Sequence, residues 1–105
     1  MKFTASGALL DACVLGALAP APTYGYDLTQ HIQGHIEVSE STLYPVLRRL
    51  LQNGLLECYD EPFDGRNRRY YRLTDRGGQA LEGYRTEWAA YWQNIETLLK
   101  GGQAS

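Results

Sequence analysis

The fold is decided by residues 39–54, which read SESTLYPVLRRLLQNG. Aliphatic residues recur in this stretch at the spacing of one helical face, and the pattern predicts an amphipathic helix that ends at Asn53-Gly54. The predicted buried stripe consists of Leu43, Val46, Leu47 and Leu50. The opposite side carries polar and cationic groups together with a proline, namely Ser41, Tyr44, Pro45, Arg48 and Gln52.

Two serines are candidate starts of this helix. Ser39 is favoured as N-cap, because Val38 and Leu43 then take the two positions of a hydrophobic staple. Pro45 argues for Ser41 instead, since the proline would then fall at the fourth helical position, where no N–H partner is required. Counted from Ser39, the same proline removes one backbone hydrogen bond.

A first helix is predicted upstream, from Ala8 to Leu18. Its apolar residues recur at every fourth position, at Leu10, Val14 and Leu18. The run Ala-Pro-Ala-Pro at 19–22 then forces the helix to end. A second, shorter helix follows, with Thr23 as predicted N-cap and with Gly34 as predicted left-handed residue at its C-terminal end.

Two short strands are predicted after the third helix, from Leu55 to Asp60 and from Arg68 to Leu73. The intervening residues 61–67, EPFDGRN, have a strong turn composition. These residues therefore predict a hairpin whose second strand is basic.

A long helix is predicted at the C-terminal end, capped by Thr74 and weakened in its first turns by Gly77 and Gly78. Its apolar residues step by three and four positions in an uninterrupted heptad pattern. They are Leu81, Tyr84, Trp88, Tyr91, Ile95 and Leu98, with Trp92 and Leu99 widening the stripe. So broad an apolar face exceeds what the small domain before it can cover, and this predicts packing against a second copy.

The chain is long enough for one compact domain with a small core, at 105 residues of which 44% are hydrophobic. A net charge of -2 and a pI near 5.6 argue against a protein that coats nucleic acid indiscriminately. Positive charge is nevertheless concentrated, because seven of the eight arginines lie between Arg48 and Arg76.

The two cysteines, Cys13 and Cys58, fall in a predicted helix and a predicted strand, and we expect free thiols in a reducing cytoplasm. Lys2 and the Ala-Leu-Ala at 17–19 loosely mimic a secretory signal, but Asp11 interrupts the apolar stretch between them. No segment approaches the ~20 apolar residues that a membrane span needs, so no membrane partner is expected.

These elements follow the order of a winged helix-turn-helix, in a fold that is mainly α with a small β-hairpin wing. A helix fits the major groove, where Arg48 would donate two hydrogen bonds to guanine, and hairpin arginines would reach phosphates or a narrow minor groove. The residues expected to contact double-stranded DNA are Ser41, Thr42, Tyr44, Arg48, Arg49, Gln52, Arg66, Arg68 and Arg69.

Two other interpretations stay open on these residues alone. The arginines are also compatible with a solvated surface, and a winged helix also serves as a protein-interaction module without DNA binding. Binding to random duplex DNA at low salt discriminates a DNA-binding protein from an interaction module, because a pure interaction module shows none. The sequence offers no nucleophile motif and no phosphate-cradling glycine loop, so an enzyme is not expected.

His31 and His35 are spaced so that they could share a metal ion. No cysteine or carboxylate completes a recognisable ligand set around them, and we expect an exposed polar face with no metal and no other cofactor.

Three motifs together resemble the PadR-like family of transcriptional regulators. Residues 23–28, TYGYDL, look like that family's opening of the second helix. Residues 41–50, STLYPVLRRL, look like its recognition helix, and residues 68–74, RRYYRLT, look like its wing strand. The resemblance covers nearly the whole chain and implies that Pro45 is tolerated within the recognition helix.

The resemblance further implies a homodimer, built by the first and last helices, that represses a nearby promoter from a palindromic operator. Residues 1–75 would form the DNA-binding domain, 76–100 the dimerisation helix and 101–105 a flexible tail, similar to the smaller family members with one C-terminal helix. The expected dimer contacts are Leu10, Val14, Leu81, Tyr84, Trp88, Tyr91, Trp92, Ile95 and Leu98.

Trp88 and Trp92 lie one turn apart on the apolar stripe of the last helix. Aromatic residues at helical spacing are most often packing residues, which favours a place in the dimer core. A second hypothesis is a ligand pocket, because flat indole faces from two copies would sandwich a small aromatic effector, as resembles drug-responsive and phenolic-responsive members of the family.

Overall fold

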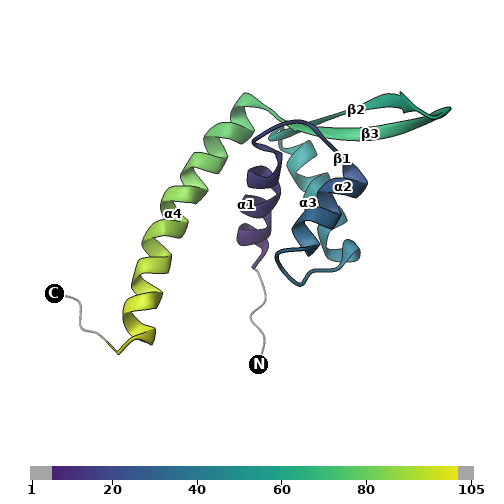
Figure 1. The fold of residues 1–105 in the computed structure, drawn as a ribbon. Helices are drawn as coiled ribbons and strands as arrows, with labels where there is room; N and C mark the ends of the chain where they lie inside the picture. Colours follow the sequence, from purple (N-terminus) through teal and green to yellow (C-terminus); the bar gives the residue numbers. More distant parts are fainter. Residues whose placement is uncertain (1–5, 102–105) are drawn as a thin grey trace.

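The computed structural model describes residues 6–101, and in this part of the chain it contains four helices and a three-stranded antiparallel sheet (Figure 1). The elements are α1 (Gly7–Leu18), β1 (Thr23–Tyr24), α2 (Gly25–Gln33), α3 (Glu40–Gln52), β2 (Leu56–Phe63), β3 (Arg66–Leu73) and α4 (Asp75–Leu99). The predicted fold, mainly α with a hairpin wing and a long C-terminal helix, is confirmed.

The core lies between the first three helices and the base of the hairpin. The predicted stripe of α3 is buried along its whole length, with every member at most 4% exposed. Helix α1 contributes Val14 and Leu15, both fully buried. The helix predicted over residues 8–18 is confirmed.

Helix α3 begins at the earlier of the two candidate serines. The Ser39 hydroxyl accepts a hydrogen bond from the Thr42 N–H at 3.2 Å, and Pro45 lies inside the helix. The helix ends as predicted, because Asn53 is its C-cap and Gly54 takes a positive φ of 75°. The cost of one lost backbone hydrogen bond is therefore outweighed by the cap and by the buried stripe.

Two predictions about α2 are wrong. Thr23 is not an N-cap but part of β1, where it pairs with Tyr71 of β3, and the helix begins after Tyr24 without a side-chain cap. Gly34 does not adopt a left-handed conformation either, since its φ is -70° and the chain continues in a turn in which His35 and Ile36 donate to the Ile32 carbonyl. The first difference arises from a strand partner far away in sequence, whereas local backbone hydrogen bonds close the turn after α2.

The hairpin is longer than predicted and its turn is shorter. Asp64 and Gly65 form the whole turn with φ of 51° and 75°, as a two-residue type I′ turn requires, and residues 61–63 extend β2. Pro62 is tolerated because β2 is an edge strand in the order β1-β3-β2. The hairpin projects from the helical body as the wing (Figure 1).

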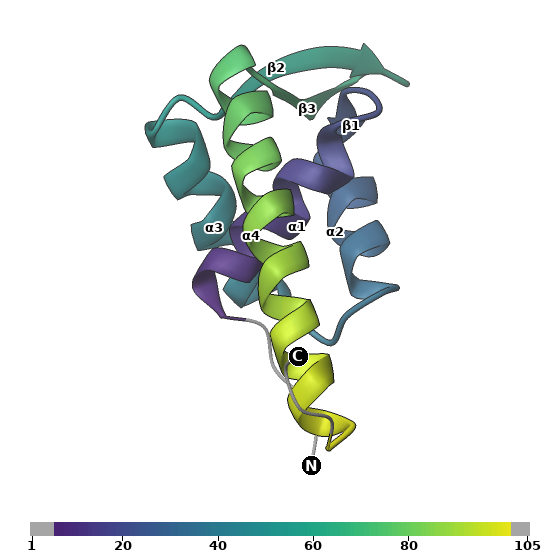
Figure 2. The same cartoon turned by 90° about the vertical axis from the view of Figure 1, so that its left-hand side faces the viewer.

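Helix α4 starts at the predicted N-cap, Thr74. Its first turn also requires Gly77, which was predicted only to weaken the helix. The Thr74 hydroxyl accepts from the Gly77 N–H at 3.0 Å and donates to the Gly54 carbonyl at 2.7 Å. A Cβ at Gly77 would lie 2.1 Å from the Leu55 carbonyl oxygen, so only glycine permits this close approach. The helix then slants away from the body, crossing α1 with α2 and α3 on either side (Figure 2). Of the predicted tail, only Gly101 is among the described residues.

Candidate nucleic-acid interface

The outer face of α3 presents a row of polar groups to solvent. The predicted DNA-contacting residues of this face are all exposed, namely Ser41, Thr42, Tyr44, Arg48 and Gln52. At the start of the helix the Ser39 hydroxyl lies 3.0 Å from both the Ser41 and the Thr42 hydroxyls. These side chains are therefore held in a local network at the end of the helix where such proteins contact bases.

Arg48 and Arg49 are neighbours in sequence but have different surroundings. Consecutive helical residues point about 100° apart, and Arg48 lies on the exposed outer face. Arg49 instead forms an ion pair and hydrogen bond with Asp11 of α1. The structure thus separates Arg49 from the other predicted DNA-contacting residues of α3 and ties it to the helical body.

The three predicted DNA-contacting arginines of the wing lie in three different environments. The guanidinium of Arg68 lies between two aromatic rings, 4.5 Å from the centre of Tyr24 and 3.7 Å from that of Phe63. Arg69 lies 3.6 Å from Asp60, a partly screened surface pair. Arg66 begins β3 next to the turn and is exposed. The wing tip therefore carries both Asp64 and Arg66, while stacking on two rings holds Arg68 on the flank of the wing.

An aromatic cluster on the outer face of the sheet was not predicted. Tyr59 and Tyr70 stack with ring centres 5.7 Å apart, and Tyr70 contacts Tyr24, which in turn contacts Tyr26. The hairpin register was the missing information, because it places Tyr59 directly opposite Tyr70. Reading Asp64-Gly65 as a two-residue turn would have given that register from the sequence.

The opposite face of the sheet packs on the helices. The ring of Tyr71 lies against Gly25, where an added Cβ would be 3.1 Å from the ring. Burial raises the pKa of the Tyr71 phenol, and the nearby positive charge of Arg69 acts in the opposite direction. This contact explains the glycine between two tyrosines in the motif at 23–28.

The apolar stripe of α4 is covered only near its start. Leu81 is 4% exposed, whereas Trp88, Tyr91 and Leu98 are 45%, 61% and 73% exposed. Leu10, Val14 and Leu81, which were predicted to contact a second copy, pack in the core of the single chain and are at most 5% exposed. The remaining predicted contacts, from Tyr84 onward, are partly or largely exposed.

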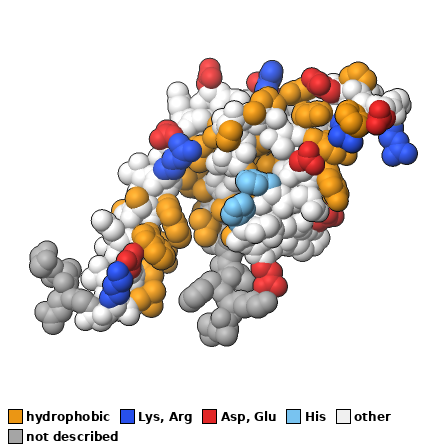
Figure 3. Space-filling model, in the orientation of Figure 1, with side chains coloured by type: hydrophobic (Ala, Val, Ile, Leu, Met, Phe, Trp, Pro, Cys, Tyr) orange, Lys and Arg blue, Asp and Glu red, His pale blue; other side chains and the backbone are white. Residues whose placement is uncertain are grey.

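A groove of about 360 Å³ runs between α1 and the middle of α4. Its lining includes Leu9 and Ala12 from α1 and Tyr84, Trp88 and Tyr91 from α4. Trp88 and Trp92 stack with ring centres 5.9 Å apart and planes inclined by 24°. In Figure 3 hydrophobic side chains line the side of α4 that faces the body.

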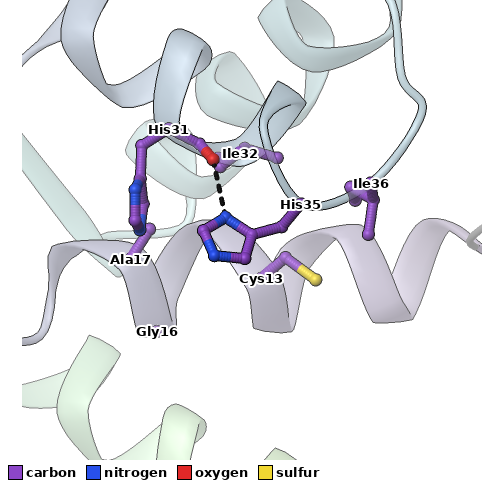
Figure 4. Close-up of a pocket in the computed structure, with 7 residues that line it drawn as sticks. All are labelled: Cys13, Gly16, Ala17, His31, Ile32, His35 and Ile36. Atoms are coloured by element: carbon purple, nitrogen blue, oxygen red, sulfur yellow. Dashed lines mark hydrogen bonds between the residues drawn. The ribbon is translucent and has the colours of Figure 1, made fainter.

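A smaller pocket of about 240 Å³ lies between α1 and the end of α2 and contains Cys13, His31 and His35 (Figure 4). His35 Nδ1 is 3.0 Å from the His31 carbonyl oxygen, so the ring donates to a carbonyl at the end of α2. Burial raises the pKa of the Cys13 thiol. Among residues 6–101, no three potential ligands gather around one point that could hold a metal ion. Both described cysteines are free thiols, as predicted.

Helix α2, the turn after it and the exposed face of α3, followed by a wing with arginines at its tip, define a winged helix-turn-helix protein. The family model of the transcriptional regulator PadR-like family matches residues 14–83. The chain belongs to this family.

Three relatives illustrate the similarity. The chain is 38% identical over 92 residues to the transcriptional regulator Rv3488 of Mycobacterium tuberculosis, covering 87% of this chain and 82% of that protein. The crystal structure of smu.1704 from Streptococcus mutans superposes with a TM-score of 0.89 at 34% identity, covering 100% of this chain and 99% of that one. A PadR-like transcriptional regulator from Bacillus cereus, BC4206, gives a TM-score of 0.79 at 30% identity, covering 91% and 93% of the two chains.

Family membership makes the protein a DNA-binding transcriptional regulator, in a family of regulators and not of enzymes. Family membership also favours DNA binding over the alternative of a protein-interaction module that does not bind DNA. Within the described part of the chain, no helix combines the length and the apolar composition that crossing a bilayer requires.

Proposed function

We propose that the protein is a cytoplasmic repressor that binds a palindromic operator as a homodimer, with residues 1–75 as DNA-binding domain and 76–100 as dimerisation helix. The observation that carries this proposal is that the chain exposes two surfaces of different character. The outer face of α3 is polar and cationic, whereas the second half of α4 exposes Trp88, Tyr91 and Trp92. A stripe of large aromatic side chains at heptad spacing is typical of helix pairing.

In this dimer two copies of α3 enter successive major grooves, roughly 34 Å apart. Arg48 donates two hydrogen bonds to a guanine, while Ser41, Thr42, Tyr44 and Gln52 contact other base edges or phosphates. Arg66 and Arg69 contact phosphates from the wing, and Arg68 does so from its fixed position between two rings. The hydrogen bonds at the start of α3 support this role, because they restrict the side chains that would contact bases.

The test begins with selection of bound duplexes from a random pool, where an enriched palindrome is expected. Arg48→Ala should then cost about 1–3 kcal/mol on the operator and relax sequence preference at one position. Arg66→Ala should weaken operator and random duplexes alike and reduce the salt slope by about one. Arg85→Ala is the matched control, since this exposed arginine lies on α4, paired with Glu82 at 2.5 Å. Equal losses of Arg48→Ala on specific and random DNA would contradict base reading.

The dimer is tested by sedimentation equilibrium. We expect the wild-type chain to dimerise through Tyr84, Trp88, Tyr91, Trp92, Ile95 and Leu98. Tyr91→Ser combined with Leu98→Ser should shift the chain to monomer while leaving its helical content unchanged, because both side chains are exposed in the single chain. A monomeric wild-type protein at micromolar concentration would refute the dimer.

We also propose that a small planar aromatic effector binds beside Trp88 and Trp92 and releases the operator. The groove of about 360 Å³ along Trp88 supports this, since it has the size and aromatic lining of a small-molecule site. Binding should quench the indole fluorescence and weaken operator affinity together. A panel of planar aromatics that changes neither quantity would argue that the indoles only pack.

A further inference from the structure

Helix α1 mediates between the recognition helix and the last helix. Among the described residues, α3 and α4 each contact α1 far more than they contact each other. Figure 2 shows the same arrangement, with α4 lying over α1 and α3 to one side. A change in the angle of α4 therefore reaches α3 through α1.

Asp11 is the charged residue of α1 at this junction. Its carboxylate forms an ion pair with Arg49 of α3, 38 residues away in sequence. The Asp11 side chain is only 15% exposed, and that of Arg49 is 45% exposed, so the pair is less screened than an ordinary surface pair. Among the described residues no ion pair holds the neighbouring Arg48, which lies on the exposed face of α3.

Asp11 also faces α4 through Tyr84. Burial is the main cause that raises the pKa of the Tyr84 phenol; the negative charges of Asp11 and Glu87 raise it further, and the positive charge of Arg49 acts in the opposite direction. Tyr84 in turn lines the groove beside Trp88. The Asp11 carboxylate is therefore paired with Arg49 of the recognition helix, and its charge acts on Tyr84 of the last helix.

We propose that Asp11 is a positioning residue that joins the recognition helix to α4 by holding Arg49 on one side and Tyr84 on the other. In this arrangement Arg49 fixes the angle of α3 and does not contact DNA. The proposal rests on the proposed function, in which α4 is the dimerisation helix and α3 reads the operator. It adds the route by which events at α4 change the placement of α3.

The chemistry suits this role. A charge-assisted hydrogen bond is directional and stronger than a neutral one, so a shared carboxylate restricts both partners. Base contacts tolerate little displacement, and residues behind a binding surface hold its side chains to about 0.5 Å. Loss of the link should therefore weaken specific binding while sparing the nonspecific phosphate contacts.

The experiment is a double-mutant cycle on operator binding with Asp11→Asn and Arg49→Gln. Each single variant should weaken operator binding about tenfold, and the double variant should be no worse than either single one. Binding to random duplex DNA and the slope of affinity against salt should stay unchanged, because Arg49 neutralises no phosphate. Tyr84→Phe, which removes only the hydroxyl, should weaken operator binding in the wild-type background but not with Asp11→Asn.

Arg49→Lys serves if Arg49→Gln does not fold, since it keeps the charge but loses the fork geometry of the guanidinium. It should lose operator affinity and keep random-duplex affinity. Additive losses in the cycle, with a salt slope lower by about one, would overturn the proposal and make Arg49 a phosphate contact. A wild-type chain that enriches no operator would overturn the proposed function and this proposal with it, whereas an additive cycle in an operator-binding dimer overturns this proposal alone.

Discussion

Helices α3 and α4 are both amphipathic, yet they differ in where their apolar residues are covered. All four aliphatic residues of the α3 stripe are buried by the same chain. In α4 only Gly77 and Leu81 are buried, and the stripe beyond Trp88 is largely exposed. The apolar stripe of α3 is covered entirely by the same chain, which leaves the polar outer face of α3 exposed to solvent. Helix α4 has an apolar surface that the described part of the chain leaves exposed.

The largest expected effect on stability is the difference between replacing a buried leucine of α3 and an exposed leucine of α4. Leu50 is 1% exposed and Leu98 is 73% exposed. Leu50→Ala should lower the free energy of unfolding by about 3 kcal/mol, through lost burial and the cavity that remains. Leu98→Ala should change it by less than about 0.5 kcal/mol in urea unfolding at protein concentrations low enough to keep the chain monomeric. Equal losses would mean that the end of α4 is already packed in the monomer.

Substitutions of two glycines of α4, Gly77 and Gly83, test how far along the helix its close packing on the rest of the chain extends. Gly77→Ala should cost about 2–3 kcal/mol, because the new methyl group would collide with the Leu55 carbonyl oxygen. Gly83→Ala meets nothing within 4 Å and should stabilise the helix by up to about 1 kcal/mol. Thermal unfolding of the two variants side by side measures the difference. If Gly77→Ala is tolerated, the start of α4 is less tightly docked than the structure has it.

The N-caps of the two helices offer a smaller contrast. Thr74 caps α4 and also donates to the Gly54 carbonyl, whereas the exposed Ser39 caps α3. Thr74→Ala should cost about 1–2 kcal/mol and Ser39→Ala about 0.5–1 kcal/mol, both measured by urea unfolding. A larger loss for Ser39 would show that the hydroxyl network at the start of α3 contributes to stability beyond the cap.

Much of this fold could be predicted because its signals are local. The stripe of α3 follows from the spacing of aliphatic residues, and the caps of α3 and α4 were found from hydroxyl residues at the start of the predicted helices. The PadR-like motifs then placed the recognition helix and the wing. Each of these features depends on residues within a few positions of one another, which is where sequence patterns are informative.

The features that were missed depend on tertiary partners. Strand β1 has two residues and exists because β3 lies beside it. The place of Arg68 between Tyr24 and Phe63 was missed because it requires the hairpin register. The pairing of Arg49 with Asp11 spans 38 residues and leaves no trace in spacing. Leu10 and Val14 were assigned to a dimer because an apolar face does not reveal which surface covers it.

The smallest expected effect is a difference in reaction rate between the two thiols, and it reports on the surface of α4 that a second copy covers in the proposed dimer. Cys13 is half-buried and lines a second groove between α1 and α4, together with Leu81 and Trp88; burial raises its thiol pKa, so less of it is thiolate at pH 8. Cys58 on the wing is exposed. The Cys58→Ser variant keeps only Cys13, and the Cys13→Ser variant keeps only Cys58. A disulfide reagent at pH 8 should therefore react several times more slowly with the first variant than with the second.

Raising the protein concentration should slow the reaction of Cys13 further if a second copy covers α4, while Cys58 should react at the same rate throughout. A Cys13 rate independent of concentration, in a protein that sedimentation shows to dimerise, would place the dimer contact farther along α4, toward Leu98.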